Sequence, residues 1–169
     1  ALVGLLAAGA FAHGGPRAVV AGLLLYVVAV VLDHADGEVA RLTLGESRLG
    51  EWLDLVADMV VHGALVVALG VGAARVAGAG LTAGLVGAAG VVVSSLLAKA
   101  VPPRPGRGLL DDLSSRDGFY SMLAAFVLVR LAAPALLPAL MVFVALGAHT
   151  YWVARTLSLR RRKTWRTPK

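Results

Sequence analysis

Four aspartates lie within a stretch that otherwise has the composition of membrane helices. Residues 32–62 read LDHADGEVARLTLGESRLGEWLDLVADMVVH and contain Asp33, Asp36, Asp54 and Asp58. In or near lipid, each uncompensated charge costs about 2.5–3.5 kcal/mol or more. The fold must therefore give these carboxylates a compensating partner, and this requirement limits how the chain can be arranged.

The spacing of these residues places them on two helix faces. On a helix with 100° per residue, one arc of about 140° contains Asp33, Asp36, Gly37, Ala40 and Arg41. Gly50, Asp54 and Asp58 follow one another at intervals of four and form a second stripe. Residues 42–49 are long enough to reverse the chain between the two stripes. Two helices can therefore direct two carboxylates each into one gap.

Four converging carboxylates cannot all stay ionised without a cation. The candidate ligands are oxygen atoms and the chain has no Cys, which favours a hard ion such as Mg²⁺, Mn²⁺ or Ca²⁺ over Zn²⁺. Two ions about 3.5–4 Å apart would suit four shared carboxylates, and such a pair stabilises phosphoryl transfer. We expect two such divalent ions, bound by Asp33, Asp36, Asp54 and Asp58. The other interpretation is four carboxylates solvated at helix ends.

The same residues resemble the signature of a known family. The pattern Asp-x2-Asp-Gly-x2-Ala-Arg-x8-Gly-x3-Asp-x3-Asp, from Asp33 to Asp58, is similar to that of the CDP-alcohol phosphotransferase (CDP-alcohol phosphatidyltransferase) family at all eight positions. The family consists of membrane enzymes with six transmembrane helices, usually homodimeric. They move a substituted phosphate from a CDP-linked donor to an acceptor alcohol and release CMP. The resemblance implies the same fold, reaction and homodimer here.

The resemblance also implies a role for each residue of the pattern. The four aspartates would bind two metal ions, Mg²⁺ first and Mn²⁺ as the alternative. Asp58 would also be the catalytic base that deprotonates the acceptor hydroxyl. The residues that would receive the CDP moiety are Asp33, Gly37, Ala40, Arg41 and Gly50. Small residues let a nucleotide approach the backbone closely, and an arginine offers a planar fork to the diphosphate. The alternatives are helix packing for the small residues and a membrane-surface anchor for Arg41.

The rest of the chain has the composition of a polytopic membrane protein. It is 59% hydrophobic and 15% charged, with a mean hydropathy of +0.82. We predict an all-α membrane protein with six transmembrane helices in a single domain, residues 1–169, of which residues 160–169 are a basic cytoplasmic tail. Residues 1–13 fall short of the roughly 20 needed to span, so we expect the first helix to be cut at its start.

The remaining helices follow from apolar segments and from the residues that interrupt them. Residues 18–32 and 59–74 are the apolar segments beside the two aspartate stripes. A fourth helix is expected at residues 81–100, with glycines at spacings that suit close packing. The fifth is expected at residues 117–133 and the sixth at residues 139–159, separated by a turn that contains two prolines.

Basic residues predict the orientation of this bundle. Fifteen residues separate Arg17 from Asp33 and sixteen separate Asp58 from Arg75, each about 24 Å of helix, so the carboxylates lie at one depth. The side that carries the aspartates also holds Arg41, Arg48, Lys99, Arg104, Arg107, Arg116 and the tail, whereas the other holds Arg17, Arg75 and Arg130. By the positive-inside rule the aspartate side is cytoplasmic. We expect an integral protein of a prokaryotic inner or plasma membrane.

Four of these basic residues indicate which class of acceptor alcohol the protein would use. Lys99, Arg104, Arg107 and Arg116 fall at the cytoplasmic ends of the later helices or in the segment that joins them. Such a cluster favours inositol phosphate or another phosphorylated polyol over a neutral alcohol, and the alternative is solvated topology residues. Residues 115–117, Ser-Arg-Asp, also resemble the corresponding region of inositol-phosphate-using members. The donor stays open between CDP-diacylglycerol and a soluble CDP-polyol.

Other functions are compatible with parts of this pattern. A cation transporter or channel with an intramembrane carboxylate site is one alternative, and a family member that has lost activity and serves as a scaffold is another. The complete aspartate set argues against the scaffold. The chain has a net charge of +6. We expect its basic tail to bind anionic lipid headgroups rather than nucleic acid. We expect His62, which continues the second stripe, to be packed or water-bonded rather than a metal ligand.

The predicted role of Arg41 can be tested by keeping its charge. We expect Arg41→Lys to weaken binding of the CDP-linked donor, because a lysine cannot make the bidentate contact of the planar guanidinium. Donor affinity of the purified variant, measured by titration with CDP, checks this. Unchanged affinity would return Arg41 to the membrane-anchor interpretation.

Overall fold

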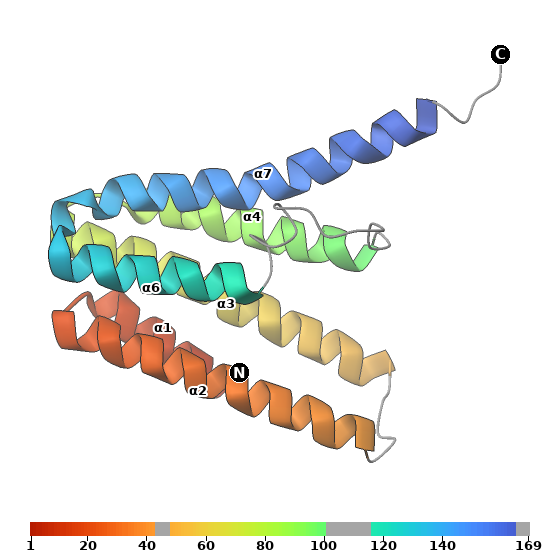
Figure 1. Ribbon diagram of the computed structural model, residues 1–169, viewed down its shortest axis with the longest axis horizontal. Coiled ribbons are helices and arrows are strands. Elements are labelled where there is room, and N and C mark those ends of the chain that lie inside the picture. Colours follow the sequence, from red (N-terminus) through yellow and green to blue (C-terminus); the bar gives the residue numbers. More distant parts are fainter. Residues whose placement is uncertain (43–47, 101–115, 165–169) are drawn as a thin grey trace.

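The fold is a bundle of helices, as predicted. The structure is a computed structural model that describes the backbone of residues 1–42, 48–100 and 116–164. Within these ranges the elements are α1 (Leu2–His13), α2 (Pro16–Leu42), α3 (Arg48–Ala77), α4 (Leu81–Ala100), α6 (Arg116–Ala132), the short 3₁₀ helix η1 (Pro134–Leu136) and α7 (Leu137–Thr164) (Figure 1). All regular structure in this part of the chain is helical, which confirms the all-α prediction.

Four of the described helices contain segments that are long and apolar enough to cross a membrane, judged by length and composition. These segments are Pro16–Val39, Trp52–Ala77, Leu81–Ala100 and Pro134–Ser158. Two further helices, Leu2–His13 and Gly118–Ala132, are apolar but shorter. Together these six apolar helices give the polytopic membrane architecture that the sequence predicts.

Several helices are longer than the sequence analysis proposed. Helix α7 begins at Leu137 and continues to Thr164, so it takes in Pro138 and the first residues of the predicted tail. Proline is tolerated in the first turn of a helix because the N–H that it lacks has no partner there. The same reason allows Pro16 to begin α2. Helix α3 ends at Ala77, where Gly78 follows with φ 76°, a conformation that favours glycine.

The helices are held by an apolar core that connects almost every element. Helix α1 packs against α2 and α3, α4 packs against α3 and α7, and α6 packs against α2 and α7. The largest fully buried side chains are Tyr26, Phe11, Phe126, Leu65, Leu69, Leu123, Leu137, Met141, Val19 and Val66. Many large apolar side chains on the outer surface are exposed, as expected of helices that face lipid.

Glycines allow the closest of these helix contacts. A Cβ added to Gly84 on α4 would lie 2.8 Å from the Cα of Gly70 on α3, and the reverse is also true. On the other side of α4, a Cβ on Gly90 would lie 2.9 Å from the Cβ of Ala148 on α7. The prediction that the fourth helix serves close packing is therefore confirmed.

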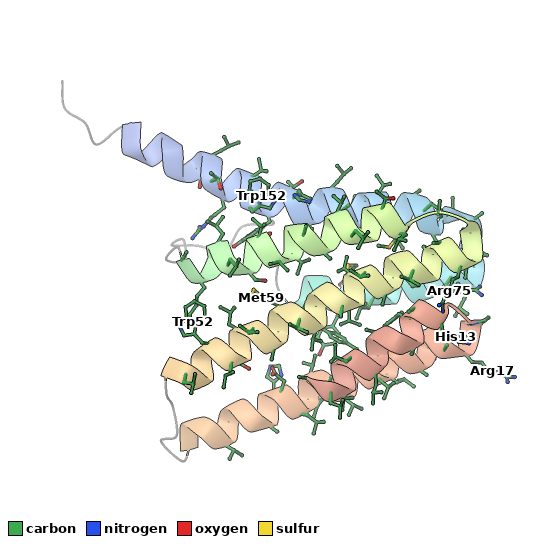
Figure 2. The ribbon with its side chains drawn as sticks, turned by 180° about the vertical axis from the view of Figure 1, so that it is seen from behind. His13, Arg17, Trp52, Met59, Arg75 and Trp152 are labelled. Carbon is green, nitrogen blue, oxygen red and sulfur yellow. The ribbon has the colours of Figure 1, made fainter. Side chains whose placement is uncertain are left out.

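Two arginines bind backbone carbonyls at one end of the bundle and connect its helices there. Arg75 at the end of α3 donates from Nη1 to the carbonyl of Ala12 at 2.9 Å, and Arg130 of α6 donates from Nε to the carbonyl of Gly14 at 2.6 Å. Both carbonyls lie at the C-terminal end of α1, where the helix dipole favours cations. Figure 2 shows Arg75, Arg17 and His13 gathered at this end, opposite Trp52.

Glycine packing between α3 and α4 gives a stability prediction. We expect Gly84→Ala to lower the thermal unfolding temperature in detergent, with a cost of about 1–3 kcal/mol, because two backbones must separate to admit the methyl group. The matched control is Gly147→Ala on α7, where an added Cβ meets nothing within 4 Å. Scanning fluorimetry of both variants checks this, and equal unfolding temperatures would show that the contact does not limit stability.

Candidate functional site

The structure describes the side chains of three of the four predicted metal ligands. Asp33 lies on α2 and is partly buried, whereas Asp54 and Asp58 lie on α3, the first exposed and the second partly buried. All three fall inside candidate membrane spans. The backbone of Asp36 belongs to α2, but its side chain lies outside the described part.

The aspartates of α2 and α3 lie toward the same end of the bundle, beyond the packing with α1. Gly4 near the start of α1 packs against Val61, and Phe11 near its end packs against Gly72, so α1 and α3 run in the same direction. Gly22 of α2 packs against Phe11. The aspartates therefore belong to the halves of α2 and α3 that lie past these contacts. Figure 1 shows α2 and α3 continuing beyond α1 toward one end of the bundle.

Most residues of the predicted substrate sites cannot be placed in detail. Gly37 is partly buried on α2, Gly50 is exposed near the start of α3, and Lys99 is exposed in the last turn of α4. The side chains of Ala40, Arg41 and Arg116, and the whole of Arg104 and Arg107, lie outside the described residues. The CDP and acceptor assignments therefore stay predictions.

His62 is engaged through both ring nitrogens, which confirms that it is a packed histidine. Its Nδ1 lies 2.8 Å from the backbone carbonyl of Asp58, and its Nε2 lies 3.1 Å from the hydroxyl of Tyr26. A carbonyl can only accept, so Nδ1–H donates to Asp58. In the neutral ring, Nε2 then accepts from the hydroxyl of Tyr26. Neither nitrogen is available to a metal in this arrangement.

An aromatic cluster surrounds this hydrogen bond. The ring of Tyr26 lies 5.7 Å from that of Phe119 and 5.2 Å from that of Tyr120, and the His62 ring meets Phe119 edge to face at 4.5 Å, all between centroids. The cluster joins α2, α3 and α6 on the inner side of the aspartates. The sequence analysis did not identify it, because helical periodicity predicts a face but not its partner.

The donor set near the aspartates fits a hard cation. Asp33, Asp54 and Asp58 offer oxygen atoms, and the nearest nitrogen donor on their stripe, His62, is already engaged. Among the side chains that the structure describes, no three His, Cys, Asp or Glu residues lie close enough to hold a metal. The predicted set of four needs Asp36 as well, so the two-metal centre stays a prediction.

A buried arginine was missed by the sequence analysis. Arg155 on α7 is 6% exposed. It is the only Asp, Glu, Lys or Arg in the candidate span Pro134–Ser158. Ionisable residues inside a membrane span usually face the interior and mark functional sites, so this isolation was the signal that could have found it.

Arg155 lies at nearly the depth of Lys99. Gly87 of α4 packs against Ala145 of α7, and Gly90 packs against Ala148, so the two helices run in parallel with a constant offset. The same offset places Lys99 level with a residue only two positions beyond Arg155, about 3 Å along the axis. Two helices thus carry a cation toward the end of the bundle that holds the aspartates.

The chain matches one family model over nearly its whole length. A model described as CDP-alcohol phosphatidyltransferase matches residues 1–159, from α1 through most of α7. The match includes the aspartate pattern and Arg155. No curated protein and no solved structure gives a significant match.

Proposed function

Because the chain belongs to the CDP-alcohol phosphatidyltransferase family, we propose that it transfers a substituted phosphate from a CDP-linked donor to an acceptor alcohol and releases CMP. Membership identifies a membrane transferase that acts on CDP-alcohols. The observation that carries the finer proposal is the position of the aspartates. Asp33 and the pair Asp54 and Asp58 sit on two helices, toward the same end of the bundle and inside candidate membrane spans.

The proposed reaction assigns the proton and the leaving group to named residues. The carboxylate of Asp58 accepts the proton of the acceptor hydroxyl. The acceptor oxygen then bonds to the phosphorus next to the alcohol moiety of the donor, and the bond from that phosphorus to the CMP oxygen breaks. Arg41 and the small residues of its helix face would hold the diphosphate that connects the two halves of the donor.

Two divalent ions, Mg²⁺ or Mn²⁺, complete the proposed site. When bound, they would neutralise negative charge on the phosphates as the leaving oxygen departs. Asp33, Asp36, Asp54 and Asp58 are the proposed ligands. Support comes from the oxygen-only donor set and from the engagement of His62, which leaves no nitrogen ligand on that stripe.

The proposal includes the orientation and assembly of the protein. Arg17, Arg75 and Arg130 occupy the end opposite the aspartates, and Arg75 and Arg130 bind carbonyls there. The larger number of Lys and Arg on the aspartate side supports a cytoplasmic site in a prokaryotic inner or plasma membrane. A homodimer is proposed from the family alone.

We expect carboxylate-to-amide changes in the pattern to abolish transfer. Asp54→Asn should eliminate metal-dependent CMP release, since it removes a shared ligand without changing volume. Asp58→Asn should lower kcat by about 10²–10⁴-fold, the usual contribution of a general base. The assay is CMP release from a panel of CDP-linked donors with and without Mg²⁺, and Glu46→Gln is the carboxylate control outside the pattern.

Two results would contradict this assignment. Near-normal turnover in Asp54→Asn would contradict the proposed dinuclear metal site. Absence of CMP release from every donor, together with cation flux through the protein in liposomes, would favour the transporter instead.

The acceptor is proposed to be a phosphorylated polyol. Buried Arg155 and exposed Lys99 lie at similar depth on parallel helices, and Arg116 begins the next helix along the chain. Cations on several helices toward one end of the bundle suit an acceptor phosphate, because charge-assisted hydrogen bonds are the strong ones. Inositol phosphate is the first candidate, and the donor tail is either diacylglycerol or a polyol.

We expect the wild type to prefer a phosphorylated polyol over the free polyol. Lys99→Gln and Arg116→Ala should each reduce that preference by about tenfold or more, the value of a hydrogen bond to a charged group. Competition between the two acceptors, read by mass spectrometry of the products, measures the preference. Arg17→Gln at the opposite end is the matched control, and a wild type that uses only unphosphorylated alcohols would refute the proposal.

A further inference from the structure

We propose that the hydrogen bond between Tyr26 and His62 sets the spacing of the two aspartate-bearing helices, so that these residues form a positioning pair for the metal site. The inference rests on the proposed function for its link to metal binding. The spacing itself can be measured without metal or substrate. Neither residue is part of the aspartate pattern.

The pair lies just inside the aspartates on both helices. His62 is one turn from Asp58 on α3, about 6 Å along the axis, and Tyr26 is two turns from Asp33 on α2, about 10 Å. The hydroxyl of Tyr26 and Nε2 of His62 are 3.1 Å apart, and the Tyr26 side chain is 1% exposed. A bond at this position acts on the segments that carry the carboxylates.

The pair is a direct connection between helices that otherwise pack mainly on a third. In the described ranges, the principal partner of α2 is α1, and α3 packs against α1 and α4. Val61 on α3, the residue before His62, packs against Gly4 of α1. The hydrogen bond between Tyr26 and His62 therefore joins α2 and α3 directly, at the level where Val61 packs against α1.

The histidine is held in one orientation, which gives the bond a fixed length and direction. Its Nδ1 is tied to the carbonyl of Asp58 at 2.8 Å, and its ring rests on the edge of Phe119. Rotation of the ring would break the bond to Asp58 as well as the bond to Tyr26. The geometry thus couples the backbone at Asp58 to the position of α2.

The chain itself provides a clean background for measuring this spacing, because it has no Cys. Spin labels on Val39→Cys in α2 and Leu49→Cys in α3, which are 58% and 70% exposed, report the distance between the helix ends. Double electron–electron resonance is measured on the full chain in nanodiscs without metal. Binding of Mn²⁺ alone to the unlabelled, Cys-free variants is measured in parallel by calorimetry.

Tyr26→Phe removes one hydroxyl and keeps the ring in the aromatic cluster. We expect it to broaden or shift the distance distribution and to weaken Mn²⁺ binding by about two- to tenfold, the value of one hydrogen bond. His62→Leu should do the same, and His62→Gln should retain more affinity because its side-chain oxygen can accept from Tyr26. The control is Ser94→Ala, which removes a 3.1 Å bond from α4 to the carbonyl of Ala148 on α7. It should change neither measurement.

Each outcome bears on whether Tyr26 and His62 position the two helices for metal binding. An unchanged distance distribution in Tyr26→Phe and His62→Leu overturns the inference whatever the enzyme does. A changed distribution with unchanged Mn²⁺ affinity shows a purely structural bond and also overturns it. Absence of Mn²⁺ binding in the wild type refutes the proposed metal site, whereas the distance measurement still tests the spacing.

Discussion

The energetic cost of carboxylates within a membrane span governs the whole molecule. Asp33, Asp54 and Asp58 lie inside segments that are apolar enough to cross a bilayer, where an unpaired charge is costly. Their position on two helices, toward one end of the bundle, calls for a compensating positive charge, which the proposed divalent cations would supply.

The two ends of the bundle have different roles: one holds the helices together and the other carries the aspartates. At one end, Arg75 and Arg130 satisfy the last carbonyls of α1, so charged side chains serve the backbone. Glycines such as Gly70 and Gly84 then bring the backbones of α3 and α4 into direct contact. This arrangement fixes the helices far from the aspartates. The halves of α2 and α3 that carry the aspartates are joined by the bond between Tyr26 and His62.

The sequence was a good guide to what depends on composition and spacing. Apolar segments, prolines and glycines predicted the helices, and the stripe of small residues predicted the close packing of α4. It was a poorer guide to features that depend on contacts between distant residues. Helix α7 continues to Thr164 because no residue between 160 and 164 stops it. The tyrosine that binds His62 lies 36 residues away, and only the fold brings the two together. A count of basic residues at helix ends and in loops does not predict Arg155, although it is the only Asp, Glu, Lys or Arg in the apolar span Pro134–Ser158.

His62 shows how one hydrogen-bonding arrangement can serve two requirements. Its position, one turn beyond Asp58, would suit a nitrogen ligand in a mixed site, and nitrogen donors favour ions such as Zn²⁺. Because Nδ1 donates to a carbonyl and Nε2 accepts from Tyr26, the ring contributes to helix spacing instead. The donors left on the stripe are then oxygens, which would suit the proposed Mg²⁺. The contact that spaces the helices therefore also bears on which ion the aspartates would accept.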